Sequence, residues 1–383
     1  MARALYIHWP FCLKKCPYCD FNSHVRADVE VARWQSGLIA DMRREAEVAG
    51  GETLQSIFFG GGTPSLMPPS LVSALLREAE SLWGFDENVE ITLEANPSSV
   101  EAARFADLAS AGVNRVSLGL QSFDDDALQM LGRLHSAKEG LAALAVAQDH
   151  FDRVSFGLIY ASPGQSEAAW SAMLERALGM GTDHLSLYQL TIEPGTRFAT
   201  DVRRGALHPL DDDSAADLFA ITRELTEAAD LPAYEISNHA RPGQESRHNL
   251  TYWRYRDYCG IGPGAHGRRG GAATLRHKKP ENWLASIDRQ GDGLSEVRLQ
   301  HKREQASEAL LMGLRLAEGV HLAALSQRTG IGRGGLVEEG RLAFFCELGL
   351  AWSAGDRIGI TPGGMPVLDG LLAEIVPSEL VAV

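Results

Sequence analysis

The stretch YIHWPFCLKKCPYCDF, at Tyr6–Phe21, decides how this chain folds and which chemistry it can carry. It overlaps a short apolar run, Ala4–Trp9, which is typical of a buried strand. A CxxxCxxC pattern follows and holds three of the chain's five cysteines, Cys12, Cys16 and Cys19. Thiolates are the usual ligands of iron–sulfur clusters, and three of them on a four-iron cluster leave one iron open. The spacing therefore predicts a cluster site directly after the first strand.

Two other interpretations of the cysteine triplet stay open on spacing alone. A short run of cysteines is also a zinc pattern, with His8 or His24 as the fourth ligand. Alternatively, the three thiols are unrelated and bind nothing. The rest of the chain must separate these possibilities.

Length and composition set the class of protein. The chain has 383 residues, enough for one large α/β domain and a smaller one. No apolar run approaches the roughly 18 residues of a membrane span, and no signal-peptide pattern precedes the first strand. Five cysteines, three of them clustered, do not form a disulfide framework, which predicts a reducing compartment, the cytoplasm.

The charge of the chain argues against a nucleic-acid partner. The net charge is −14, whereas a broad nucleic-acid surface needs a basic face. Two small basic patches, Arg268–Arg269 and His277–Lys279, are interpreted as solvated loops.

Short strand-like runs recur about every 30 residues from Met1 to Ala240 and alternate with helical stretches, which predicts successive βα units. The predicted strands are Ala4–His8, Ser56–Phe59, Val89–Glu94, Arg115–Leu120, Arg153–Tyr160 and His184–Leu190. Six such units form an open parallel sheet or a partial (β/α) barrel. In both architectures, ligand-binding residues gather at the carboxyl ends of the strands.

Unusual residues do follow these strands. The second strand runs into GGGTP at Gly60–Pro64, where glycines allow a close backbone approach to a ligand or simply form a tight turn. The third ends at Glu94, and the fourth ends at Gln121 with Arg133 twelve residues further on. Each polar residue alone is more often a surface group, but their shared position favours a ligand site.

The segment after Ser295 changes in character. It is predicted to contain helices at Glu304–Leu316, Arg341–Leu348 and Met365–Ile375, a glycine-rich loop at Gly330–Gly334, and a hairpin at Trp352–Thr361. This pattern resembles a small winged-helix-like module without a basic recognition helix. We interpret it as a lid or as a docking surface for a protein partner.

The CxxxCxxC pattern with Tyr18 before its last cysteine resembles the radical S-adenosylmethionine (SAM) superfamily. The resemblance implies that Cys12, Cys16 and Cys19 hold a [4Fe–4S] cluster. It also implies that SAM chelates the fourth iron and is cleaved to a 5′-deoxyadenosyl radical. In this superfamily a GGGTP element meets the amino group of SAM.

Eight motifs in one order narrow the resemblance to the oxygen-independent coproporphyrinogen oxidase-like family. They are YIHWPFCLKKCPYCDF, GGGTP, EANP, SLGLQS, LIY…PGQ, LYQLTIEPGT, YEISNHA and GIGPGAHG, and they span nearly the whole chain. The family implies cofactor contacts around SAM at Tyr6, Tyr18, Gly61, Gly62, Thr63, Glu94, Gln121 and Arg133.

Two branches of this family compete, a heme-chaperone branch and the oxidase itself. The oxidase has a fourth cysteine where this chain has Phe21, and an N-terminal extension where this chain has five residues before Tyr6. The chain also contains HNxxYW at His248–Trp253, which resembles a heme-binding motif of the chaperone branch. These features favour the chaperone, whether or not it catalyses a net reaction. The oxidase, which decarboxylates coproporphyrinogen III, is the alternative, and an RNA-modifying radical SAM enzyme is a distant third.

The chaperone branch implies that heme is a further ligand. It also implies that apo-hemoproteins, in particular respiratory ones, are the partners, and that any contact with a membrane is made through such an acceptor. His248 would be the axial ligand, and Tyr252 and Trp253 would border the macrocycle. Asn249 is a further cofactor-binding residue of the motif, and Arg247 and Arg254 would meet the propionates. The alternative is that these residues pack a core and fix a loop. His8, His239 and His266 are other possible iron ligands, and Cys259 and Cys346 are interpreted as structural.

One position departs from the family. An acidic residue that is expected to hold SAM is replaced by Gly157, which should weaken SAM binding by about 1–3 kcal/mol. The predicted architecture is a partial (β/α)6 radical-SAM barrel over residues 1–240. A connecting segment with the HNxxYW motif follows over 241–295, and an α+β winged-helix-like module over 296–383.

Overall fold

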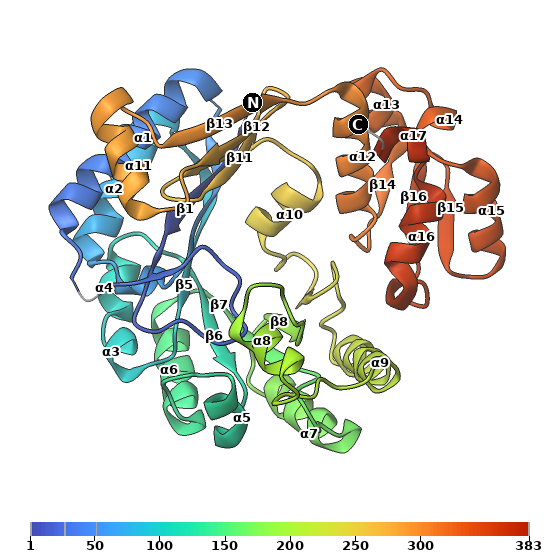
Figure 1. Ribbon diagram of the computed structural model, residues 1–383, viewed down its shortest axis with the longest axis horizontal. Coiled ribbons are helices and arrows are strands. Elements are labelled where there is room, and N and C mark those ends of the chain that lie inside the picture. Colours follow the sequence, from blue (N-terminus) through green and yellow to red (C-terminus); the bar gives the residue numbers. More distant parts are fainter. Residues whose placement is uncertain (1, 27, 51, 382–383) are drawn as a thin grey trace.

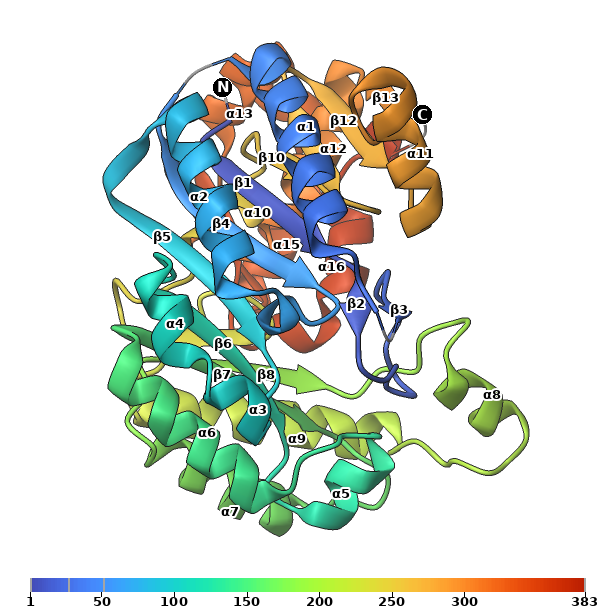
Figure 2. The same cartoon turned by 90° about the vertical axis from the view of Figure 1, so that its left-hand side faces the viewer.

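The computed structural model describes residues 2–26, 28–50 and 52–381, and its centre is an eight-stranded sheet (Figures 1 and 2). The six predicted parallel strands are confirmed: β1 (Ala4–Trp9), β4 (Leu54–Gly61), β5 (Phe85–Ala95), β6 (Arg115–Gln121), β7 (Arg153–Tyr160) and β8 (His184–Gln189). Two short strands that the sequence did not reveal extend the sheet. β10 (Cys259–Ile261) lies parallel to β1, and β9 (Asn238–Ala240) lies antiparallel to β8.

Helices cover the outer face of this sheet (Figure 2). They are α1 (Val31–Ala49), α2 (Pro69–Trp83), α3 (Ser99–Ala102), α4 (Phe105–Ser110), α5 (Asp125–Met130), α6 (Ala137–His150), α7 (Glu167–Leu178) and α9 (Asp212–Ala228), with the 3₁₀ turn η1 (Pro64–Leu66) before α2. Several of these helices begin at a residue whose side chain caps the first turn. At α6, for example, Ser136 and Glu139 form a capping box. The short α8 (Arg197–Arg203) lies apart, in the long loop after β8.

Alternation along the strands separates an apolar face from a polar face. Residues such as Ile57, Leu93 and Leu118 pack with the outer helices in the main hydrophobic core. Their neighbours Glu94 and Gln121 face the opposite, concave side and line a pocket there. The polar concave face is where a ligand can be held.

Helix α10 (Arg247–Trp253) lies on the concave side of the sheet, between the sheet and the C-terminal part (Figure 1). Its neighbours are β4 and α12. The helix that carries the HNxxYW motif therefore packs inside the fold.

A second, three-stranded sheet packs beside α1. It consists of β11 (His266–Arg269), β12 (Ala272–Arg276) and β13 (Leu294–Leu299), with α11 (Pro280–Gln290) before the last strand. Trp283 stacks on Trp34 with ring centroids 5.3 Å apart, and the buried Arg276 bonds Asp41 and Glu45 of α1. Fully paired buried charges such as these fix one arrangement of the two layers.

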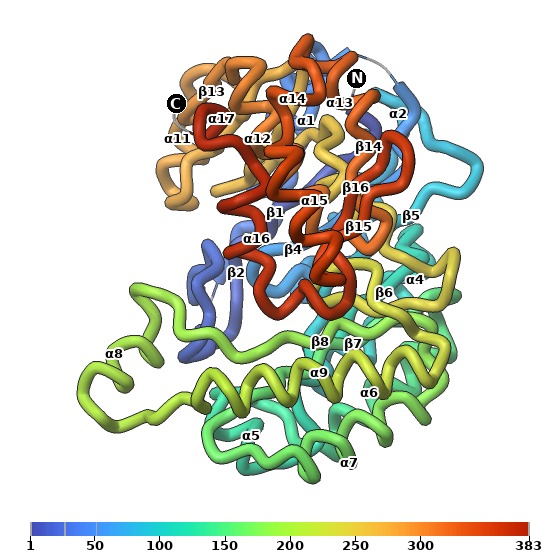
Figure 3. The backbone as a smooth tube through the Cα atoms, turned by 90° about the vertical axis from the view of Figure 1, so that its right-hand side faces the viewer, coloured from blue at the N-terminus to red at the C-terminus, as the bar shows by residue number. Residues whose placement is uncertain are grey.

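The C-terminal part has its own hydrophobic core. Its elements are α12 (Lys302–Gly313), β14 (Val320–His321), α13 (Leu322–Thr329), α14 (Arg333–Leu336), α15 (Glu339–Glu347), β15 (Ala351–Ala354), β16 (Arg357–Ile360), η2 (Met365–Val367), α16 (Leu368–Ile375) and α17 (Ser378–Val381). Its backbone, from α12 to α17, is drawn in orange to red in Figure 3. The predicted helices and hairpin are confirmed. β14, α13 and α17 were not predicted, and the predicted loop at Gly330–Gly334 is cut short because α14 begins at Arg333.

Tyr255 connects α10 to the C-terminal part. Its side chain is 1% exposed, and its hydroxyl hydrogen is shared between Glu308 Oε2 at 2.6 Å and Gln300 Oε1 at 3.2 Å. The guanidinium carbons of Arg268 and Arg328 lie 3.6 and 5.0 Å from the ring centroid, which is cation–π geometry. Its φ of +52° is unusual for a residue other than glycine and is held by these contacts.

Two further observations concern the molecule as a whole. In the described part of the chain, no helix combines the length and apolarity that crossing a bilayer requires. The predicted boundaries at residues 240 and 295 stay predictions, although β10, which lies between them, joins the main sheet.

Candidate cofactor pocket

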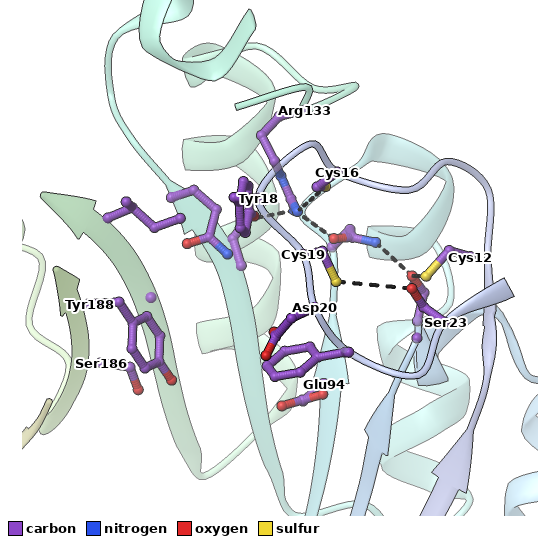
Figure 4. Close-up of a pocket in the computed structure, with 18 of the residues that line it drawn as sticks. Cys12, Cys16, Tyr18, Cys19, Asp20, Ser23, Glu94, Arg133, Ser186 and Tyr188 are labelled. Carbon is purple, nitrogen blue, oxygen red and sulfur yellow. Dashed lines mark hydrogen bonds between the residues drawn. The ribbon is translucent and has the colours of Figure 1, made fainter. Parts of the chain in front are cut away.

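A cavity of about 580 Å³ opens at the carboxyl ends of the parallel strands (Figure 4). Ten of the residues predicted from the sequence line it: Cys12, Cys16, Tyr18, Cys19, Gly61, Gly62, Thr63, Glu94, Gln121 and Arg133. Five predicted residues do not: Tyr6, His248, Asn249, Tyr252 and Trp253. The sequence therefore predicted one cluster of polar residues that the fold brings together, and a second group that lies elsewhere.

The cysteine loop is pinned at both ends. The two-residue strands β2 (Phe11–Cys12) and β3 (His24–Val25) pair with each other, and the His24 N–H donates to Pro10 O at 2.7 Å. The Asn22 side chain donates to the carbonyls of Pro263 and Lys278 at 2.9 and 3.0 Å. The loop thus depends on segments about 240 positions further along the chain.

Each thiol in the loop has a polar neighbour. Thr63 Oγ1 lies 3.5 Å from Cys12 Sγ, Arg133 Nη1 lies 3.7 Å from Cys16 Sγ, and Ser23 Oγ lies 3.9 Å from Cys19 Sγ. Burial raises the pKa of the Cys12 and Cys19 thiols above the usual value. In the described residues, no three His, Cys, Asp or Glu side chains have the geometry of a metal site. The cluster-ligand role of the cysteines therefore stays a prediction.

The glycine-rich turn after β4 packs against the cysteine loop. A Cβ at Gly62 would lie 2.6 Å from Phe11 O, and one at Gly61, whose φ is +112°, would lie 2.5 Å from the His8 ring. The amides of Gly62 and Thr63 donate to Trp9 O and Phe11 O at 2.7 and 2.8 Å. These two glycines are therefore needed for contact between protein segments, and these two amides are not free for a ligand.

Two polar groups in the pocket lack sufficient partners of their own. Glu94 accepts one hydrogen bond, from the Gly61 N–H at 3.3 Å, and desolvation raises its pKa from 4.5 to about 7. Among the residues that the structure describes, none forms a hydrogen bond with the buried Gln121 Oε1. A carboxyl and an amide oxygen that need donors fit a ligand with hydroxyl or ammonium groups, which SAM has.

The sequence did not identify several residues that line this pocket. Asn96 lies between Thr63 and Arg133 and bonds both. Ser186 and Tyr188, on β8, line the opposite wall (Figure 4). Asn96 lies two residues after the predicted strand Val89–Glu94 and could have been found by the rule that located Glu94. Ser186 and Tyr188 alternate with the buried Leu185 and Leu187 in β8, so they could have been predicted only by knowing which face of the strand is turned toward the pocket.

Helix α10 is held by hydrogen bonds on the concave side of the sheet. His248 is 1% exposed, and its ring nitrogens bond Ser56 Oγ at 3.1 Å and Tyr252 OH at 2.5 Å. Burial lowers the pKa of His248 to about 3. The rings of Tyr6 and Phe58 pack against its imidazole. Neither ring nitrogen of His248 is free for iron in this arrangement, which favours the packing role that the sequence left open.

The rest of the motif has similar partners. Asn249 donates to Tyr234 OH at 3.3 Å, and Trp253 is half-buried beside α12. Arg247 bonds Asn88 O, and Arg254 forms a bidentate pair with Glu318 at 2.7 and 2.8 Å. Both predicted propionate ligands are thus already bonded.

The other possible iron ligands differ in exposure and in hydrogen bonding. His8 bonds Tyr6 OH and Asn22 O, His239 is 1% exposed, and His266 is exposed. Cys259 is buried in β10 and Cys346 lies in α15.

Comparison with known proteins adds the family. The sequence matches the radical SAM superfamily over residues 6–177 and the HemN C-terminal domain over residues 300–367. It is 36% identical to the heme chaperone HemW of Haemophilus influenzae over 387 aligned positions, 98% of each chain. It is 42% identical to the mouse mitochondrial radical S-adenosyl methionine domain-containing protein 1, over 83% of this chain and 74% of the mouse protein.

The fold matches that of a solved enzyme. Coproporphyrinogen III oxidase HemN of Escherichia coli, described as a radical SAM enzyme, superposes with a TM-score of 0.82 over 97% of this chain and 89% of that chain. At 20% identity this likeness concerns the fold alone. Sequence identity over nearly full length decides the branch, and the chain belongs to the HemW family of the radical SAM superfamily.

Proposed function

We propose that this protein is a heme chaperone that binds a [4Fe–4S] cluster, SAM and heme, and that passes heme to apo-hemoproteins. The observation that carries the proposal is the single cavity in which the three cysteines meet the polar rim of the sheet. The names of the relatives support the chaperone over the oxidase.

The cluster is assigned to Cys12, Cys16 and Cys19. When bound, such a cluster supplies an iron with an open position and one electron for cleavage of SAM. The chain's own contribution is to hold the thiols on a loop tied to the sheet and to place a donor near each sulfur. A fourth protein ligand is not required.

SAM is assigned to the wall formed by Glu94, Gln121, Arg133 and the glycine-rich turn. The unpartnered oxygen of Gln121 and the weakly bonded Glu94 carboxyl can accept from SAM hydroxyl or ammonium groups. The absence of a side chain at Gly157 leaves space on this wall that an acidic residue would fill.

Heme is assigned to the HNxxYW segment, with His248, Asn249, Tyr252 and Trp253 as its residues. Ligation of iron by His248 would require its imidazole to give up either the bond to Ser56 of β4 or the bond to Tyr252 of the same helix. Heme binding therefore implies a local rearrangement at α10, close to Tyr255, whose side chain bonds the C-terminal part. We assign that part to docking of the acceptor; the acceptor's identity and the cytoplasmic location stay predictions.

The test uses anaerobically reconstituted protein in two assays. Heme is titrated by absorbance into the intact protein and into His248→Ala and Trp253→Ala, with Trp352→Ala of the C-terminal hairpin as a control. Coproporphyrinogen III turnover is measured with SAM and a reductant. Stoichiometric heme binding without turnover supports the chaperone, whereas formation of protoporphyrinogen IX contradicts it. Unchanged heme affinity in both motif variants would move the heme site elsewhere.

A further inference from the structure

A chain of hydrogen bonds joins two of the cysteines through Asn96. The Asn96 side-chain N–H donates to Thr63 Oγ1 at 3.1 Å, and Arg133 Nη2 donates to Asn96 Oδ1 at 2.5 Å. At its two ends, Thr63 Oγ1 lies 3.5 Å from Cys12 Sγ and Arg133 Nη1 lies 3.7 Å from Cys16 Sγ (Figure 4). One amide therefore bonds both groups that reach the thiols.

The direction of these bonds follows from the chemistry of the amide. Because the Asn96 N–H occupies a lone pair of Thr63 Oγ1, the hydroxyl hydrogen of Thr63 is free to point at Cys12 Sγ. Arg133 has donors only, so both of its terminal nitrogens must donate. Nη2 donates to Asn96 Oδ1 and to Gly119 O at 2.9 Å, which orients Nη1 toward Cys16. Asn96 thus fixes two donors that point at two sulfurs.

Hydrogen bonds to cysteine sulfur stabilise the more negative, reduced form of an iron–sulfur cluster and raise its reduction potential. A donor that can rotate away contributes less than one held in place. Thr63 is 4% exposed and packed under the cysteine loop, so its hydroxyl has few other acceptors. The effect on the cluster therefore depends on the residue that holds the donors.

We propose that Asn96 is a positioning residue that holds Thr63 and Arg133 as donors to Cys12 and Cys16 and so raises the potential of the bound cluster. The inference rests on the proposed function only in requiring that the three cysteines bind a cluster. It assigns to Arg133 a role toward the cluster in addition to its predicted contact with SAM.

The experiment measures the midpoint potential of the cluster in the reconstituted full chain without SAM, by redox titration followed by electron paramagnetic resonance. Iron and sulfide per chain are determined first. Asn96→Ala and Thr63→Val should each lower the potential, while Thr63→Ser, which keeps the hydroxyl, should not. Ser117→Ala, which alters the same pocket without touching this chain of bonds, is the matched control.

The double variant Asn96→Ala/Thr63→Val tests whether Asn96 affects the potential by positioning Thr63 or acts independently of it. Since Asn96 acts partly through Thr63, the shift of the double variant should be smaller than the sum of the single shifts. An unchanged potential in cluster-loaded Asn96→Ala overturns the proposal. Should that variant lose iron, Thr63→Val decides, and an unchanged potential there overturns it equally. Wild-type protein that binds no cluster contradicts the proposed function instead, so the two failures are distinguishable.

Discussion

At the scale of single residues, the pocket depends on groups that are only partly satisfied by the protein. Glu94 is the clearest example, because its pKa is raised from 4.5 to about 7 by loss of hydration. At a pH between 4.5 and about 7, Glu94 is ionised in the unfolded chain but still protonated in the folded chain. The contribution of Glu94 to the stability of the ligand-free protein should therefore fall as the pH rises from about 4.5 through 7, opposite in sign to that of buried histidines such as His248, whose pKa is lowered.

Replacement of Glu94 by Gln should remove this dependence. We expect Glu94→Gln to be more stable than wild type by roughly 2 kcal/mol at pH 8 and to be nearly equal to it at pH 4.5. Urea unfolding of the cluster-free proteins at the two pH values measures the difference. Parallel pH profiles for the two proteins would contradict the assignment of the raised pKa to Glu94.

Gly157 offers a test of the missing carboxylate. A Cβ there would lie 3.4 Å from Tyr188, 3.6 Å from Ser186 O and 3.7 Å from Gln121 Oε1, which are ordinary contacts. Gly157→Asp should therefore fold normally and bind SAM about tenfold more tightly, by roughly 1.4 kcal/mol. Equilibrium dialysis with cluster-loaded protein measures the affinity. Gly157→Ala adds the Cβ alone and should leave it unchanged; equal gains in both variants would attribute the effect to packing.

At the scale of elements, α10 carries the predicted heme motif, and its histidine bonds protein groups in this structure. Loss of the His248 side chain removes hydrogen bonds to Ser56 and Tyr252 and leaves a cavity beneath the sheet. His248→Ala should cost about 2–4 kcal/mol in the free energy of unfolding. Asn249→Ala, which removes one long bond of a half-buried side chain, should cost about 1 kcal/mol or less. Denaturant unfolding measures both, and equal costs would contradict the packing role of His248.

The six parallel strands and the residues at their ends could be predicted because strand periodicity and turn residues are local signals. β9 and β10 could not, because three-residue strands carry no periodic pattern and exist only through pairing with β8 and β1. The surroundings of His248 were equally hidden, since Ser56 lies 192 positions away in sequence. The position of Asn96 near the end of a strand could be predicted. Its role could not, because that role depends on contacts with Thr63 and Arg133 that the sequence does not show.

At the scale of the whole molecule, Tyr255 is a buried polar connection between the segment that follows α10 and the C-terminal core, in addition to the ion pair of Arg254 with Glu318. Tyr255→Phe keeps the ring and its cation–π contacts but leaves Glu308 and Gln300 without their donor. We expect a loss of about 1–3 kcal/mol, concentrated in the C-terminal part. Hydrogen exchange should show faster exchange in α12 and α13 than in β4–β7. Tyr258→Phe is the control, because the Tyr258 hydroxyl makes no hydrogen bond with any residue that the structure describes. Uniform protection in Tyr255→Phe would contradict the connection.

The anchoring of the cysteine loop by Asn22 has a consequence for how the protein is made. The loop emerges first from the ribosome, yet its partners Pro263 and Lys278, and the strand β10 that flanks β1, are synthesised roughly 240 residues later. Until then the thiols lie on an unsupported edge. We expect nascent or truncated chains to be poor recipients of iron and sulfide. Cluster insertion would then report that translation has passed Lys278, and chains that end before this residue would not accumulate a redox-active centre.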